Sequence, residues 1–201
     1  MVKGYYRLIS TIDDNVGRLR EVLAASDLAE NTVIIFLGDN GYFLGERNQS
    51  CKWLMYENSL RVPFMVYDPQ STAARSSKQI ALNIDVAPTV LDYAGVAIPE
   101  QVQGRSLRPL VQSDAENWRT DFVCEHLYEL PYIPKSEGIR TEDWKYFRYV
   151  DQPEVEELYH LAKDPLELVN LIDDPAQQQR VATYRQQLEQ KTNDLTNARQ
   201  K

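Results

Sequence analysis

Residues 31–41 read NTVIIFLGDNG, and this short stretch decides the fold class. Its VIIFL run is continuously apolar and rich in β-branched residues, which is typical of a strand buried on both faces of a parallel sheet. Asp39 and Asn40 follow directly, so a carboxylate and an amide stand just past the carboxyl end of the strand. Ligand sites of open α/β sheets gather at such strand ends. The stretch therefore predicts an α/β fold with a polar site after this strand.

The segments on either side of this stretch agree with an α/β fold. Residues 5–25 place apolar side chains at spacings of three and four, which predicts one amphipathic helix. Residues 61–69, RVPFMVYDP, read as a second short strand that ends at a proline. A second helix is predicted after Asp85, a candidate N-cap, and it stops at Gly95. The two strands would then belong to one parallel sheet, and the helices would pack on it.

The pattern changes near residue 115. Short, aromatic-rich and partly alternating stretches follow, separated by turn residues, and they predict a small antiparallel sheet between about residues 120 and 160. From residue 175 the chain is polar and made of good helix formers, with Val181, Tyr184 and Leu188 as its apolar stripe. We therefore divide the chain into residues 1–114 and a subdomain of residues 115–201 with a terminal surface helix.

Composition excludes several classes of function. The 22 Lys and Arg residues face 30 Asp and Glu residues, and the net charge of -8 leaves no basic stripe for nucleic acid. No window approaches the roughly 18 apolar residues of a membrane span, and the start carries no signal-peptide pattern. Neither Cys51 nor Cys124 lies in a Cys-x-x-Cys or Cys/His cluster, so no zinc site is predicted.

Few residues are candidates for chemistry. Asp39 and Asn40 offer oxygen donors of the kind that calcium prefers, although calcium takes about six to eight oxygens and Asp-Asn-Gly is also common turn chemistry. Lys52, brought back to the strand end, would neutralise an anionic substrate; the alternative is a solvated surface lysine. The two histidines, His126 and His160, lie in predicted strands, where packing or surface roles are the common ones. No phosphate loop or nucleophile elbow is present.

The order of these segments resembles the carboxy-terminal part of sulfatases, in the alkaline-phosphatase-like superfamily. One collinear series of motifs carries the resemblance over about residues 4–172, and together they are far more specific than any one alone. The motifs are YYRLISTIDDNVGRL, NTVIIFLGDNGYFLGE, MYENSLRVPFMVYDP after Lys52, NIDVAPTVLDYAGVAIPEQVQGRSLRPLV, EGIRTEDWKYFRY and EELYHLAKDPLELVNL.

The resemblance implies a hydrolase of sulfate esters, acting on a sulfated glycan or an aryl sulfate. Asp39 and Asn40 would be ligands of a Ca²⁺ ion that holds the sulfate group. Lys52 would be the catalytic and substrate-binding lysine that contacts the sulfate or the ester oxygen, and His126 is a further candidate for a substrate contact. In the family, a formylglycine made from Cys or Ser attacks sulfur, while metal and cations stabilise the transferring group. Many bacterial relatives are exported, which implies a periplasmic or secreted protein.

The sequence also departs from the family pattern. The nucleophile of the family arises in a Cys/Ser-x-Pro-x-Arg segment, but Lys-Trp-Leu follows Cys51 and Glu-His-Leu follows Cys124. We therefore expect no nucleophile in this chain, an inactive isolated chain, and self-association through an exposed core face. Two alternatives stay open: a non-catalytic remnant that binds a partner or carbohydrate, and a phosphoester or phosphonate hydrolase of the same superfamily. The second is disfavoured because such enzymes often carry Asp-His where this chain has Asp39 and Asn40.

Overall fold

The computed structural model describes residues 2–71, 73–113 and 115–199. The chain divides into two compact units, and each is described by itself. Unit 1 comprises residues 1–39, 43–51 and 62–116. Unit 2 comprises residues 40–42, 52–61 and 117–201. The predicted boundary falls at residue 114, which lies outside the described residues. Two short segments before it, residues 40–42 and 52–61, belong to unit 2 although the residues on either side of each belong to unit 1.

Unit 1 begins with one long helix, α1 (Val2–Ala25), as the apolar spacing predicts. The backbone turns back at the end of α1, where the N–H of Leu28 donates to the carbonyl oxygen of Leu23 and Asp27 adopts a positive φ of 55°. A short 3₁₀ helix (Ala29–Asn31) then leads into strand β1 (Ile34–Leu37). Along α1 the Arg20 guanidinium lies 5.7 Å from the centre of the Tyr67 ring, which links the helix to strand β4 (Phe64–Tyr67).

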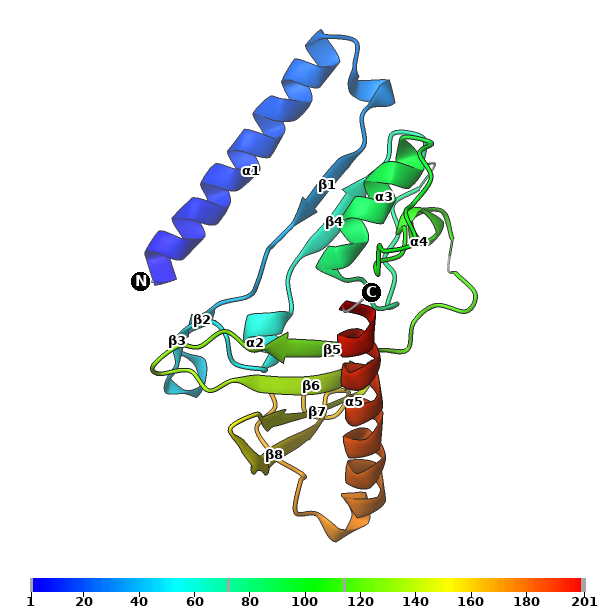
Figure 1. Ribbon diagram of the computed structural model, residues 1–201. Coiled ribbons are helices and arrows are strands. Elements are labelled where there is room, and N and C mark those ends of the chain that lie inside the picture. Colours follow the sequence, from blue (N-terminus) through cyan, green and yellow to red (C-terminus); the bar gives the residue numbers. More distant parts are fainter. Residues whose placement is uncertain (1, 72, 114, 200–201) are drawn as a thin grey trace. The chain divides into compact units, whose positions relative to one another are not determined.

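The parallel pairing predicted for β1 is wrong. β1 pairs with β4 in an antiparallel two-stranded sheet, with Ile34 opposite Tyr67 and Leu37 opposite Phe64 (Figure 1), and no pair of described strands is parallel. A parallel pair needs a crossover connection, usually a helix, whereas the connection from 38 to 63 carries only short elements. All four β1 residues are half-buried rather than buried. The fold class is therefore mixed α/β with antiparallel sheets.

The rest of unit 1 is made of short elements. Strands β2 (Phe43–Leu44) and β3 (Ser50–Cys51) form a small hairpin around a 3₁₀ turn (Glu46–Asn48). Asp85 closes the 3₁₀ turn Asn83–Asp85 just before helix α3 (Val86–Tyr93), and helix α4 (Arg108–Gln112) follows. Asp85 occupies the N-cap position of α3, as predicted, but its buried carboxylate accepts hydrogen bonds from the Leu82 and Arg105 N–H groups rather than from the first turn of α3.

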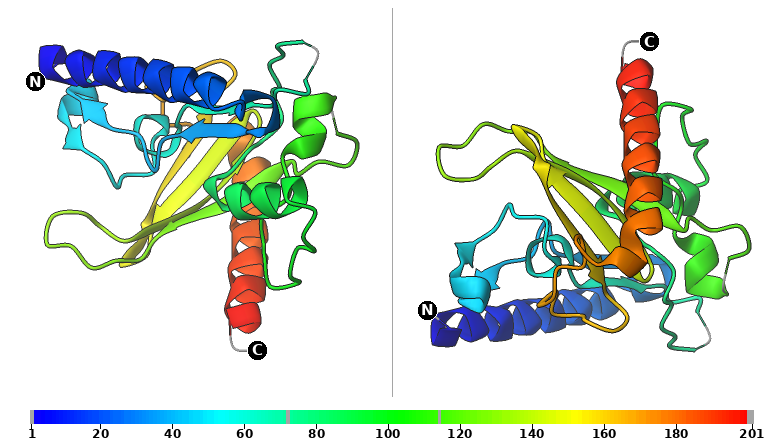
Figure 2. Two further views of the ribbon diagram at one scale, coloured as in Figure 1. Left: turned by 90° about the horizontal axis from the view of Figure 1, so that it is seen from above. Right: turned by 90° about the horizontal axis from the view of Figure 1, so that it is seen from below.

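Unit 2 contains the antiparallel sheet predicted for the second half of the chain. Strands β5 (Asp121–His126), β6 (Ser136–Thr141), β7 (Trp144–Tyr149) and β8 (Gln152–His160) form a meander in sequence order. After a 3₁₀ turn (Pro175–Gln177), helix α5 (Gln178–Arg199) lies across this sheet (Figures 1 and 2). The predicted stripe of Val181, Tyr184 and Leu188 is buried against Ile139, Tyr146 and Leu158 of the sheet.

The opposite face of this sheet is covered by a segment from earlier in the chain. Successive strand residues point to opposite faces, so Phe147 and Tyr159 face away from α5 and pack with Met55. Met55 precedes the one-turn helix α2 (Glu57–Leu60), which belongs to the same unit. The sheet therefore has two apolar faces, and the second one holds the segment that follows Lys52.

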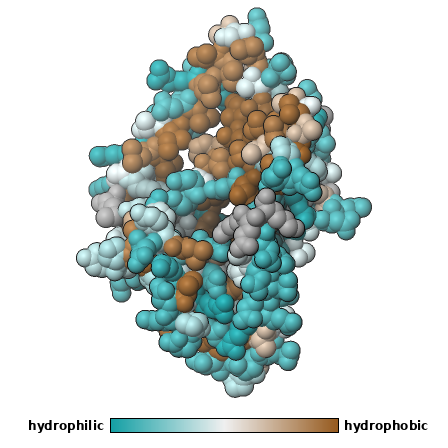
Figure 3. All heavy atoms as spheres, in the orientation of Figure 1, coloured by the Kyte–Doolittle hydropathy of each residue, from teal (hydrophilic) through white to brown (hydrophobic). Residues whose placement is uncertain are grey.

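Helix α1 exposes its apolar stripe. None of its described residues is buried, and Leu8, Leu19 and Val22 are 65%, 49% and 61% exposed. Apolar residues gather in Figure 3 where Figure 1 draws α1, β1 and α3. Large exposed apolar patches are rare on monomeric proteins and mark interfaces or association-prone surfaces.

No described helix is long and apolar enough to cross a membrane.

We expect the isolated chain to self-associate through α1. Replacing Leu8 and Leu19 with lysine places two charges in the exposed stripe and should shift the chain towards monomer in sedimentation velocity runs at rising concentration. Asp14→Lys, on the opposite face of the same helix, adds positive charge outside the stripe and is the matched control. Equal suppression by the control would show that net charge, rather than the apolar stripe, governs association.

Candidate functional site

The predicted polar site lies where β1 ends. The N–H of Gly38 donates to the carbonyl oxygen of Pro63 at 3.2 Å, which is the last backbone hydrogen bond before the strands separate. Asn83 then fixes the backbone that follows, because its Nδ2 donates to the Asp39 carbonyl oxygen at 2.8 Å and to the Gly38 carbonyl oxygen at 3.3 Å. The Asp39 side chain is exposed. The chain thus presents a carboxylate on an anchored backbone.

Asn40 and Lys52 are in direct contact. The Lys52 Nζ donates to the Asn40 Oδ1 at 2.7 Å, and the Asn40 Nδ2 donates to the Gly41 carbonyl oxygen at 2.8 Å. Both side chains are half-buried. Charge-assisted hydrogen bonds are shorter and stronger than those between neutral groups. The structure therefore brings together two of the residues that the sequence singles out, although 12 positions separate them along the chain.

The backbone around Lys52 is held in an unusual conformation. Cys51 and Trp53, on either side of it, have positive φ angles of 84° and 92°, in a region that residues other than glycine seldom adopt. Each such residue costs about 1–3 kcal/mol and persists only where its surroundings enforce it. One such restraint is the hydrogen bond from the Trp53 N–H to the Ser59 Oγ at 2.9 Å.

His126 is connected to Lys52 through Trp53. The His126 ring centre lies 5.1 Å from that of Trp53, and the Lys52 Nζ lies 4.8 Å from the centre of the same indole. His126 is 8% exposed, and its buried Nε2 has no hydrogen-bond partner among the described residues. Burial lowers the pKa of His126, which favours the neutral imidazole. The His160 ring instead packs against Trp144 at a tilt of 36°, with ring centres 4.2 Å apart.

Sequence reasoning missed Trp53 and Ser59. Trp53 stands beside Lys52 and contacts both it and His126, and Ser59 fixes the backbone of Trp53. An aromatic residue next to a candidate lysine was the available signal for Trp53. Nothing local marks Ser59, because its role depends on the way residues 53–59 fold back.

The oxygen donors present suit calcium in kind but not in number. The exposed Asp39 carboxylate and the Asn40 amide oxygen are hard ligands, as calcium requires. In the described parts of the chain no three His, Cys, Asp or Glu side chains gather in a group that could hold a metal. The residues therefore fit a share of a calcium site, and any further ligands would come from elsewhere.

Comparison with known proteins identifies the family. Residues 45–194 match the family described as N-sulphoglucosamine sulphohydrolase, C-terminal. The chain is 34% identical over 177 residues to N-acetylglucosamine-6-O-sulfatase of Bacteroides thetaiotaomicron, covering 85% of this chain and 32% of that protein. It is 36% identical over 177 residues to choline-sulfatase of Rhizobium meliloti, covering 86% of this chain and 33% of that protein. The chain thus spans about a third of the length of these curated relatives.

Solved structures match nearly the whole chain. A protein solved in complex with its substrate D-glucosamine-2-N,6-O-disulfate matches with a TM-score of 0.86 at 32% identity, covering 94% of this chain and 40% of that chain. The phosphonate monoester hydrolase of Agrobacterium radiobacter matches with a TM-score of 0.80 at 25% identity, covering 97% of this chain and 40% of that chain. The chain belongs to the sulfatase family and corresponds to the carboxy-terminal region of its members.

Proposed function

We propose that this chain supplies the carboxy-terminal share of a sulfatase active site that hydrolyses sulfate esters. In this proposal Asp39 and Asn40 are ligands of Ca²⁺, and Lys52 contacts the sulfate group or the ester oxygen. The observation that carries the proposal is the 2.7 Å contact between the Lys52 Nζ and the Asn40 Oδ1, just after a strand end, in a chain of this family. The chain itself thus pairs a lysine with a strand-end amide.

The Lys52 ammonium and a calcium ion would compete for the same oxygen. The Asn40 Oδ1 that would face the metal accepts the hydrogen bond of Lys52. Two cations close together repel each other, so a Ca²⁺ ion held by Asp39 and Asn40 would favour contact of Lys52 with the anionic sulfate group. Bound calcium would supply electrostatic stabilisation of charge on the transferring sulfuryl group. The role of Lys52 in this scheme is to add a second positive charge on the substrate side.

The groups around Lys52 suit the organic part of a substrate. Trp53 is 39% exposed and offers apolar surface next to the lysine, while His126 offers a neutral, buried ring nitrogen without a partner among the described residues. We propose His126, whose ring lies against Trp53, as a further substrate contact. A sulfated sugar is the substrate class that we propose, since one structural match was solved in complex with D-glucosamine-2-N,6-O-disulfate and one curated relative is named N-acetylglucosamine-6-O-sulfatase.

The two segments of the chain would have different tasks. Residues 1–114 would complete the catalytic domain, in which β1 and β4 join the larger alkaline-phosphatase-like sheet, and residues 115–201 would form the small subdomain. The exposed apolar stripe of α1 supports this arrangement. This chain matches only about a third of each relative, and the remaining two thirds could supply the residues that cover the stripe. The proposal thus accounts for an apolar surface that the described residues leave open.

Phosphonate ester hydrolysis is the second candidate. The similarity to the Agrobacterium phosphonate monoester hydrolase supports it, and both reactions need cations around a tetrahedral oxyanion. Parallel assays of an aryl sulfate and an aryl phosphonate monoester separate the two candidates. Higher kcat/KM for the sulfate is the result expected here.

The test is an assembled enzyme in which this chain replaces the matching region of the Bacteroides relative. Asp39→Ala and Lys52→Ala should each lower kcat/KM for sulfate ester hydrolysis by about 100-fold or more, because each removes charge stabilisation from the transition state. Lys163→Ala, at an exposed lysine whose only described hydrogen bond is made by its backbone, is the matched control and should leave the rate unchanged. A folded, active chimera whose Asp39→Ala and Lys52→Ala variants match the parent would contradict the assignment.

A further inference from the structure

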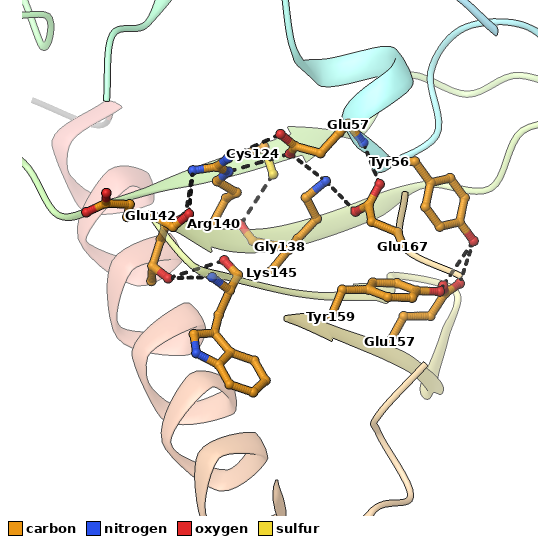
Figure 4. Close-up of polar contacts among 12 residues, drawn as sticks. Tyr56, Glu57, Cys124, Gly138, Arg140, Glu142, Lys145, Glu157, Tyr159 and Glu167 are labelled. Carbon is orange, nitrogen blue, oxygen red and sulfur yellow. Dashed lines mark hydrogen bonds and ion pairs between the residues drawn. The ribbon is translucent and has the colours of Figure 1, made fainter. Parts of the chain in front are cut away.

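Helix α2, five residues after Lys52, is anchored by a buried cluster of charges. The fully buried Lys145 ammonium lies 2.8 Å from the Glu57 carboxylate and 2.7 Å from the Glu167 carboxylate (Figure 4). Arg140 adds a second cation on Glu57 at 3.1 Å. The Glu57 N–H also donates to the Glu167 Oε2 at 2.7 Å. Glu57 is therefore tied through both its backbone and its side chain.

The charges in this cluster balance, with two cations facing two carboxylates. Burial alone would raise the pKa of Glu57, but Lys145 and Arg140 together outweigh it and hold the pKa below its usual value. Burial raises the pKa of Glu167, which among the described residues has Lys145 but no such second cation beside it. Glu57 is thus the carboxylate that stays ionised most firmly, and it is the one carried by α2.

One residue of α2 holds the neighbours of both Asn40 and Lys52. The buried Ser59 accepts a hydrogen bond at its Oγ from the Trp53 N–H at 2.9 Å. Its carbonyl oxygen accepts one from the Gly41 N–H at 2.8 Å. A Cβ on Gly41 would lie 2.1 Å from the Asn58 carbonyl oxygen, so this close approach of the two segments requires glycine. Gly41 follows Asn40 and Trp53 follows Lys52, which makes Ser59 the shared support of the pair.

A helix as short as α2 cannot hold its own position. Four residues form a single turn, and an isolated turn is unstable because nucleation costs more than one hydrogen bond returns. Apolar contacts of Met55, Tyr56 and Leu60 with the sheet give α2 a place but are non-directional, and the Tyr56 hydroxyl, just before α2, donates to the Glu157 carboxylate. The ion cluster adds direction, since each of its hydrogen bonds fixes a distance and an angle.

We propose that Glu57 is a positioning residue for the Asn40–Lys52 pair. The Glu57–Lys145–Glu167 cluster fixes α2 on the sheet, and α2 sets the separation of Asn40 and Lys52 through the two hydrogen bonds of Ser59. This inference rests on the proposed function for the role of the pair, but the positioning itself is a property of the chain. All of these residues belong to unit 2.

Hydrogen–deuterium exchange of the full chain tests this inference, with the amides of Gly41 and Trp53 as reporters. Glu57→Gln keeps the size of the side chain and removes its charge. We expect the exchange of both amides to accelerate about ten-fold or more relative to the amides of Ile139 and Phe147 in the sheet. A purely global loss of stability would accelerate the most protected amides together and would not single out these two.

Two further variants complete the test. Glu137→Gln is the matched control, because Glu137 pairs at 2.7 Å with Arg148, which also pairs with Glu189 of α5, and it should leave the relative exchange at Gly41 and Trp53 unchanged. Ser59→Ala removes only the Oγ acceptor, so it should accelerate exchange of the Trp53 amide. The Gly41 amide keeps its acceptor, the Ser59 carbonyl oxygen, and should stay protected. The inference is overturned if Glu57→Gln leaves both reporters unchanged relative to the sheet, if Glu137→Gln moves them equally, or if Ser59→Ala leaves Trp53 protected. No turnover is measured, so failure of the proposed function would not alter these outcomes.

Discussion

Lys145→Met is expected to lower the free energy of unfolding of the chain by about 3–5 kcal/mol. The substitution keeps the length of the side chain and removes an ammonium that is 0% exposed. It leaves the Glu57 and Glu167 carboxylates, whose side chains are 15% and 1% exposed, without their shared cation. An uncompensated buried charge costs far more than the net worth of the original pair. Urea unfolding followed by circular dichroism measures the effect.

Lys191→Met is the matched control for this prediction. Lys191 pairs with Asp121 at 2.7 Å, but the two side chains are 40% and 24% exposed, so solvent screens the pair. The expected loss is about 1 kcal/mol or less, as for most exposed ion pairs. The combined variant Lys145→Met, Glu57→Gln, Glu167→Gln should recover part of the loss, because no buried carboxylate then lacks a cation. Equal losses for the two lysines would show that the cluster carries no special weight.

The purified 201-residue chain is expected to show no turnover of an aryl sulfate at any calcium concentration. The chemistry that the family resemblance implies needs a covalent nucleophile, a nearly complete calcium shell and an acid for the leaving alcohol. In the proposed function the chain would offer Asp39 and Asn40 as two ligands and Lys52 as one cation. Its two cysteines lack the sequence context of a formylglycine precursor.

The missing nucleophile decides the size of this effect. A covalent intermediate divides one difficult step into two easier ones, and charge stabilisation alone does not replace it. In well-studied hydrolases, removal of the nucleophile costs about 10⁶-fold in kcat. Tight binding of sulfate by Lys52 without turnover would agree with this view, because binding that is equal in the ground and transition states does not accelerate chemistry.

Much of the fold could be predicted from periodicity. The helix α1, the meander β5–β8 and the buried stripe of α5 all follow from apolar spacing, which states which residues share a face. The antiparallel pairing of β1 with β4 could not be predicted in this way, because an apolar run indicates burial and does not encode the direction of the neighbouring strand. Strand direction depends on the connection, which here is irregular.

The candidate site was predictable only in part. Spacing alone would leave Asn40 and Lys52 as a turn residue and a surface lysine; the family resemblance gave the reason to expect them together. The ion cluster escaped notice because Glu57 and Lys145 are 88 positions apart in the chain, and a lysine between Trp144 and Tyr146 in an alternating strand reads as solvent-facing. Such long-range pairs depend on which face of the sheet is covered, and local sequence does not state that.

The most direct test of the central claim, that this chain holds the metal and lysine side of a divided sulfatase site, is a sulfate-release assay. The chain alone and its Asp39→Ala variant are incubated with an aryl sulfate over a series of calcium concentrations, and a third sample adds a formylglycine-bearing amino-terminal sulfatase fragment. We predict that neither the chain nor its Asp39→Ala variant releases sulfate by itself. With the fragment added, the chain should release sulfate and the Asp39→Ala variant should not. Calcium-dependent release by the chain alone that disappears in Asp39→Ala would contradict the claim, because the chain would then be a complete enzyme.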